Sequence, residues 1–243
     1  MKGGLMLRLL SSLCCALVLV ACVEPDIGSD TVQPDGDITT PAGEVDATVA
    51  PAPVGETQEH VLPVRVQLLQ SAEVSELDSS LTDAEVHQRF AVVNEIWAAA
   101  GVRFEVEGIR RVPAGNEEAY AQLMASGARQ AGAVLGGVFD DSQLLEGGFN
   151  VVALEDFGAM PPGVYNCRSG VLVIGRFFGN FRREAPANVL AHELGHALGL
   201  DHLCGMGRNL MCADGSSPTA LNADQIERAA GQAGTGSPFL CSR

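Results

Sequence analysis

Hydrophobic and polar residues alternate along several short segments of the chain, as they do in β-strands with one buried face. In residues 60–69, for example, Val64, Val66 and Leu68 occupy every second position. Four segments show this alternation or a short continuous apolar run: residues 60–69, 102–112, 149–154 and 171–175. We expect these segments to be β-strands.

A different spacing, with apolar residues three or four positions apart, follows the first strand and is typical of a helix with one buried face. The apolar positions are Val86, Phe90, Val93, Trp97 and Ala100. Thr82 and Glu85 have the spacing of a capping box, and Gly101 follows the last apolar position, so both ends of a helix are marked. The single Trp lies within this stripe, which indicates a core residue and not a site residue.

Three further segments favour helices. Residues 116–126 form one candidate, and residues 188–198 are apolar enough to pass through a core. Asn222 can cap a third helix near the C-terminus.

The segment from residue 188 to residue 211, NVLAHELGHALGLDHLCGMGRNLM, contains three of the five histidines. His192 and His196 are four residues apart, which puts both imidazoles on one face of a helix at a spacing suited to a shared Zn²⁺. Glu193 points about 100° away around the helix and can reach a water on the metal. Gly199 can end the helix, so that His202 returns as a third ligand. Three nitrogen ligands and one open position define a catalytic zinc site.

This motif, followed shortly by Met211, resembles the metzincin clan of zinc endopeptidases, and its short interval from His202 to Met211 is most similar to that of the matrixins. The residues that the resemblance assigns are the zinc ligands His192, His196 and His202, the general base Glu193, the helix-ending Gly199 and the Met-turn residue Met211. Two features depart from the matrixin pattern. Leu203 stands where Ser or Thr is usual, and Cys204 and Cys212 flank the turn. The family within the clan therefore stays open.

The resemblance also implies the fold and the reaction. The fold is an α+β, zincin-like catalytic domain over residues 61–243, with a twisted mixed β-sheet, an active-site helix and a C-terminal helix. One Zn²⁺ and a zinc-bound water activated by Glu193 would hydrolyse peptide bonds, as in metalloendopeptidases of type EC 3.4.24. Residues 157–166 would include an antiparallel edge strand that pairs with the substrate backbone; a plain Pro-rich loop is equally compatible with that segment.

The N-terminal 21 residues have the organisation of a signal peptide. Lys2 and Arg8 precede an apolar run over residues 9–20, which is short for a membrane span. The run ends in Leu19-Val20-Ala21-Cys22, which resembles the lipobox of bacterial lipoproteins; an ordinary signal peptide with an incidental Cys is the alternative. The resemblance predicts a lipidated Cys22 and a protein anchored to the cell envelope, at the outer membrane or the cell surface.

Residues 22–60 favour an extended, disordered tether. They contain Pro, Gly and Thr, and between residues 23 and 59 there are nine acidic residues and no Lys or Arg. Much of the net charge of −15 lies in this segment, so the charge says little about a substrate. We expect no nucleic-acid partner.

Seven cysteines are present, of which Cys14 and Cys15 leave with the signal peptide and Cys22 takes lipid. The remaining four are Cys167, Cys204, Cys212 and Cys241. Four cysteines in an exported domain imply two disulfides, with three possible pairings. We expect Cys204 and Cys212 to lie in or near the active-site turn.

The sequence therefore predicts a monomeric, membrane-anchored zinc endopeptidase that acts on a protein or peptide. Two other functions remain open. One is a catalytically idle zinc-containing surface lipoprotein that binds a protein or glycan, although such a protein has no use for Glu193. The other is a zinc enzyme that acts on a bond other than a peptide.

Overall fold

The structure is a computed structural model. It describes residues 59–126, 137–139, 141–156, 163–177, 186–204, 209–212 and 219–241. The chain divides into two compact units, Met1–Pro51 and Ala52–Arg243, and all of the described residues belong to the second. The predicted signal peptide, Cys22 and most of the predicted tether lie outside the described residues. No helix in the described part of the chain is long and apolar enough to span a membrane.

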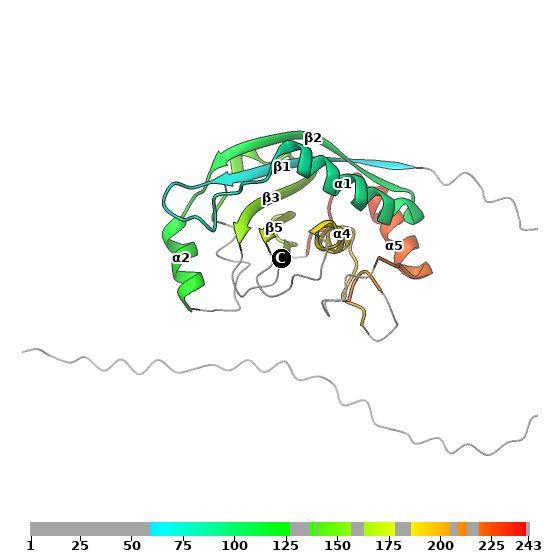
Figure 1. Cartoon of the computed structure of the whole chain (residues 1–243). Coiled ribbons are helices and arrows are strands. Elements are labelled where there is room, and N and C mark those ends of the chain that lie inside the picture. Colours follow the sequence, from blue (N-terminus) through cyan, green and yellow to red (C-terminus); the bar gives the residue numbers. More distant parts are fainter. Residues whose placement is uncertain are drawn as a thin grey trace, which may run out of the picture. The chain divides into compact units, whose positions relative to one another are not determined.

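The domain is built on a five-stranded mixed sheet (Figure 1). Its strands are β1 His60–Gln70, β2 Val102–Pro113, β3 Phe149–Asp156, β4 Gly163–Asn166 and β5 Val171–Phe177. Their spatial order is β2-β1-β3-β5-β4. The first four strands in this order run parallel, and β4 pairs antiparallel with β5 at the edge. The four strands predicted from alternation are confirmed, and part of the segment predicted as an edge strand forms β4.

The described residues contain four α-helices. They are α1 Asp83–Trp97, α2 Glu117–Ser126, α4 Pro186–Ala197 and α5 Ala223–Ala233. The predicted capping box of α1 is present: the Thr82 backbone N–H donates to the Glu85 carboxylate at 2.8 Å, and the Glu85 N–H donates to Thr82 Oγ1 at 3.2 Å. A short 3₁₀ turn, Ala98–Ala100, follows α1 and ends at Gly101, whose φ of 63° suits glycine.

Alternation along the strands produces two apolar layers, one on each face of the sheet. On one face, Val64, Val66 and Leu68 of β1 pack with α1 and α4, which lie side by side (Figure 1). Trp97 is fully buried in this layer, as predicted. On the other face, Leu69 of β1 packs with Tyr120 of α2 and with loop residues. The helix α4, which carries the motif, is therefore held both by the sheet and by α1.

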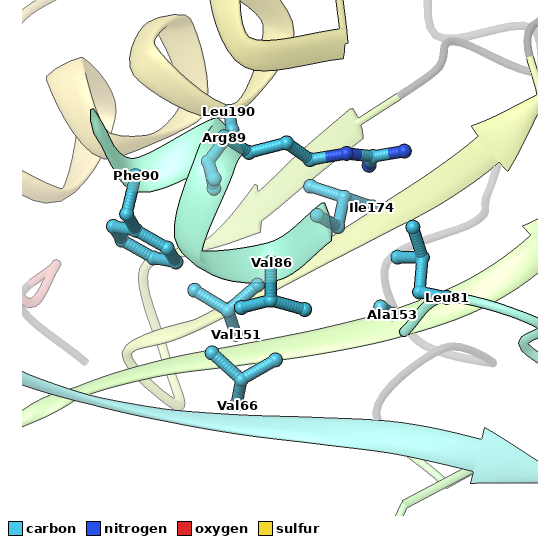
Figure 2. A pocket seen from close by; sticks show the side chains of 9 residues that line it. All are labelled: Val66, Leu81, Val86, Arg89, Phe90, Val151, Ala153, Ile174 and Leu190. Carbon is cyan, nitrogen blue, oxygen red and sulfur yellow. The ribbon is translucent and has the colours of Figure 1, made fainter. Parts of the chain in front are cut away.

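A small cavity lies in the first layer, between α1 and the sheet (Figure 2). Its volume is about 10 Å³, roughly the space of one water molecule. Its lining is apolar except for Arg89. A cavity of this size and polarity is a packing defect and cannot take a substrate.

Candidate metal centre

The helix α4 brings two of the predicted ligands to one face. Most of its other side chains, such as Val189, Leu190 and Leu194, are buried, whereas His192 and His196 are only half-buried. The helix ends in a Schellman motif, in which the Gly199 N–H donates to His196 O and the Leu200 N–H donates to Gly195 O, both at 2.9 Å. Gly199 has a φ of 78° in this motif. It therefore ends the helix as predicted.

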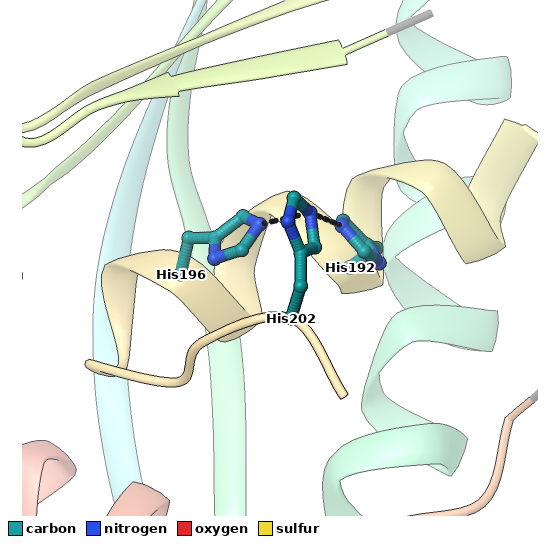
Figure 3. Close-up of side chains that lie close together, drawn as sticks. All are labelled: His192, His196 and His202. Carbon is teal, nitrogen blue, oxygen red and sulfur yellow. Dashed lines mark hydrogen bonds between the residues drawn. The ribbon is translucent and has the colours of Figure 1, made fainter. Parts of the chain in front are cut away.

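The segment after Gly199 returns His202 to the face of the helix (Figure 3). His202 Nε2 lies 3.2 Å from His192 Nε2 and 3.1 Å from His196 Nε2. Two nitrogens bound at about 2.0–2.1 Å to one tetrahedral ion lie about 3.3–3.4 Å apart, so these spacings fit a zinc site closely. In the part of the chain that the structure describes, this is the one group of three His, Cys, Asp or Glu residues placed to hold a metal ion.

The second nitrogen of each helical histidine is fixed by the backbone. His192 Nδ1 lies 2.8 Å from Leu210 O, and His196 Nδ1 lies 2.7 Å from Leu200 O. A carbonyl oxygen can only accept, so each Nδ1 carries the proton and each Nε2 presents a lone pair. A proton on His202 Nε2 can point at one of these lone pairs but not at both. The arrangement therefore suits a cation better than a set of hydrogen bonds.

The environment of the two helical histidines also favours the neutral form that binds a metal. Burial lowers the pKa of His192 below its usual value, and the hydrogen bond to Leu210 O offsets this only in part. Burial likewise lowers the pKa of His196, to about 4, with a smaller contribution from the neighbouring imidazoles. Both rings are therefore in the metal-binding state at neutral pH.

Met211 packs against α4. Its side chain is fully buried, and a Cβ added at Gly195 would lie 2.4 Å from Met211 Sδ. Gly195 therefore leaves room for the Met211 thioether against α4. The spacing of the histidines does not by itself indicate this role of Gly195.

Replacing Gly195 by Ala is expected to destabilise the protein. Ala should favour a helix by about 1 kcal/mol, but the clash with Met211 costs typically 1–3 kcal/mol. Gly231 is the matched control, because it also lies in a helix and a Cβ there meets nothing within 4 Å. Urea unfolding of the metal-free proteins should show Gly195→Ala less stable than the wild type and Gly231→Ala at least as stable. A stabilised Gly195→Ala protein would contradict the close contact.

Glu193 is 7% exposed and points toward the edge strand. A Cβ added at Gly163, the first residue of β4, would lie 2.7 Å from Glu193 Cγ and 2.9 Å from Glu193 Oε1. Glycine at this position thus allows the carboxylate to lie directly beside the strand. The contact joins the predicted base to the edge strand, and no local pattern indicates it beyond a glycine that follows two prolines.

The four cysteines of the domain form two disulfides, Cys204–Cys212 and Cys167–Cys241. This is one of the three pairings left open by the sequence. Cys204–Cys212 joins the segment after His202 to the residue after Met211, so this disulfide lies next to the candidate metal centre. The Leu203 N–H also donates to Met211 O at 2.9 Å, which holds the residue after the third histidine against the turn.

The second disulfide fastens the C-terminal segment to the hairpin of β4 and β5. The Cys241 N–H donates to Cys167 O at 3.0 Å, and the Phe239 N–H donates to Ala197 O, at the end of α4, at 2.7 Å. The Tyr165 hydroxyl, on β4, donates to Phe239 O. Burial raises the pKa of Tyr165 to about 12, so this donor stays protonated at neutral pH. The segment thereby ties β4 to α4, an arrangement that local sequence patterns did not indicate.

Comparisons with known proteins add little to this picture. No protein-family model and no curated protein matches the chain. The crystal structure of an archaemetzincin from Methanopyrus kandleri matches with a TM-score of 0.43 and 18% identity, over 78% of this chain and 93% of the other. A chaperone–substrate complex matches with a TM-score of 0.44 and 12% identity, over 72% of this chain and 34% of the other. At these values neither structure assigns a function to the chain.

Proposed function

We propose that the protein is a zinc-dependent endopeptidase of the metzincin type, similar to the matrixins. The observation that carries the proposal is the convergence of three imidazole Nε2 atoms, two of them with the tautomer fixed by backbone carbonyls, next to the buried Glu193. His192, His196 and His202 are the proposed ligands of one Zn²⁺. Three nitrogen ligands leave a fourth tetrahedral position for a reacting group.

Zinc, when bound, would supply Lewis-acid activation of a water and of the scissile carbonyl. The chain supplies the rest. Glu193 takes the proton of the attacking water and passes it to the leaving amine, which is general base and then general acid catalysis by one carboxylate. Glu193 is buried, and Gly163 leaves the space that its carboxylate occupies beside β4.

The edge strand β4 is the proposed substrate-binding element. Among the described residues β4 is the last strand of the sheet, and the edge of a sheet is where an extended peptide can pair as an added strand. A peptide that pairs with this edge at Gly163 passes beside Glu193, because the two residues are in contact. Backbone pairing of this kind selects an extended peptide in the middle of a chain, which favours an endopeptidase.

Cleavage of a proteome-derived peptide library by the zinc-loaded mature protein, read by mass spectrometry, tests the proposal. We expect internal cleavages that disappear with a chelator and return with zinc. Zinc binding without cleavage of any peptide would contradict the peptidase. That result would favour the catalytically idle surface lipoprotein or a zinc enzyme acting on another bond.

We further propose that the protein is a lipoprotein of the bacterial cell envelope, anchored through Cys22 and held away from the membrane by residues 22–60. The Leu19-Val20-Ala21-Cys22 match at the end of an apolar run supports the anchor. Two disulfides in the domain fit an oxidising compartment outside the cytoplasm.

Replacing Cys22 by Ser is expected to abolish lipid attachment, since the cysteine sulfur is the atom to which the acyl-glycerol group is attached. Cells grown with labelled fatty acid should incorporate label into the wild-type protein and not into Cys22→Ser. Cys14→Ser is the matched control, because that cysteine lies inside the predicted signal peptide. A wild-type protein that takes up no label would refute the anchor.

A further inference from the structure

Two buried amide side chains link the metal centre to the last helix. Asn209, in the turn before Met211, is 5% exposed, and Gln225, in the first turn of α5, is 7% exposed. Asn209 Nδ2 donates to Gln225 Oε1 at 2.7 Å, and Gln225 Nε2 donates to Asn209 Oδ1 at 3.1 Å. Buried amides that bond each other on both sides form a fixed connection.

Each of the two oxygens accepts a second hydrogen bond from the backbone. The Met211 N–H donates to Asn209 Oδ1 at 2.9 Å, and the Asn222 N–H donates to Gln225 Oε1 at 3.0 Å. Backbone N–H groups can only donate, so turning either amide over would set donors against donors. The orientation of the pair is therefore determined by its surroundings.

This pair orients a peptide unit that bonds a proposed zinc ligand. The Met211 N–H and the Leu210 carbonyl belong to one planar, trans peptide unit, and they point in opposite directions. Asn209 Oδ1 binds the unit at its N–H, while His192 Nδ1 donates to it at Leu210 O over 2.8 Å. Holding the N–H therefore aims the carbonyl at His192. The Leu210 N–H, which donates to Ala220 O at 2.7 Å, holds the preceding peptide unit.

We infer that Asn209 and Gln225 are positioning residues for the metal centre. They act through Leu210 O on the ring orientation and tautomer of His192. They act also on the turn whose Met211 O accepts from the Leu203 N–H, beside His202. Groups that hold a metal-binding histidine from behind typically change metal affinity by about 10–100-fold when they are removed. The inference rests on the proposed zinc site and adds two residues to it.

Zinc affinity of the mature protein, measured by competition with a chromophoric chelator, tests the inference without any substrate. We expect Asn209→Ala to weaken zinc binding by about 10–100-fold and to change the visible spectrum of the cobalt-substituted protein. Gln232→Ala is the matched control. Gln232 lies on the same helix, but its side-chain amide donates to Thr235 Oγ1 and Ser237 O, at the far end. This variant should keep wild-type affinity and spectrum.

A second variant tests the inference in case Asn209→Ala does not fold. Gln225→Glu preserves the capping box of α5, in which Glu is favoured, but replaces the donor that faces Asn209 Oδ1 by an acceptor. We expect weaker zinc binding here too, with an unchanged far-ultraviolet circular dichroism spectrum. Wild-type affinity and an unchanged cobalt spectrum in a folded Asn209→Ala or Gln225→Glu protein would overturn the inference.

The outcome separates this inference from the proposed function. A wild-type protein that binds zinc but cleaves no peptide would contradict the peptidase. The positioning role would still be supported if Asn209→Ala bound zinc more weakly, and overturned if it bound zinc normally. An active wild type whose Asn209→Ala variant binds zinc normally would contradict the positioning role alone. A wild type that binds no zinc would overturn both.

Discussion

Glu193→Gln is expected to lower kcat by about 10²–10⁴-fold while the protein keeps its fold and its zinc. Gln has nearly the same shape as Glu, so it fits the buried space between α4 and Gly163. The amide cannot accept the proton of the attacking water, and this step is lost. Steady-state hydrolysis of a quenched peptide by metal-analysed samples gives the comparison.

The control for this variant is Glu227→Gln, which makes the same chemical change at an exposed position of α5. It should hydrolyse the peptide at the wild-type rate. If zinc-loaded Glu193→Gln keeps a near-normal kcat, Glu193 is not the general base, and the chemistry of the centre has been assigned to the wrong residue.

His202→Ala is expected to weaken zinc binding by more than the roughly 100-fold that loss of a supporting residue causes, because it removes a direct ligand. The two histidines of α4 would remain, but a two-ligand site holds zinc poorly at neutral pH. His202 is exposed and follows the end of the helix, so its truncation should leave the core intact. Metal analysis after dialysis, together with chelator competition, measures the loss.

His87→Ala provides the corresponding control. His87 is an exposed histidine of α1 and lies outside the three-histidine motif. Its zinc content and affinity should equal those of the wild type. Unchanged zinc stoichiometry and affinity in His202→Ala would refute the three-histidine centre.

The parts of the fold and site that the sequence predicted are those with a local cause. Alternation along β1 and helical spacing along α1 depend on residues within a few positions of one another, and both elements formed as expected. The same holds for the turn at Gly199, where one residue with a positive φ ends α4 and returns His202. The fixed spacing of a short motif is enough to predict such local geometry.

The parts that the sequence did not predict depend on contacts between distant segments. Gly163 meets Glu193 only because β4 lies against α4, and Asn209 meets Gln225 only because α5 packs behind the turn. No local pattern marks either pair. The disulfide pairing was open for the same reason, since the distance between cysteines in the fold cannot be read from their spacing in the chain.

The contacts that α5 and residues 239–241 make around the metal centre bear on the order in which the protein is made. A chain synthesised only as far as Met211 already carries all three histidines and Glu193. It lacks the helix whose Gln225 holds the turn, and it lacks the segment from Phe239 to Cys241 that ties β4 to α4. Under the proposed function, full zinc affinity would therefore require the part of the chain that follows Met211. Peptide hydrolysis would then begin only after α5 and the segment to Cys241 have been made.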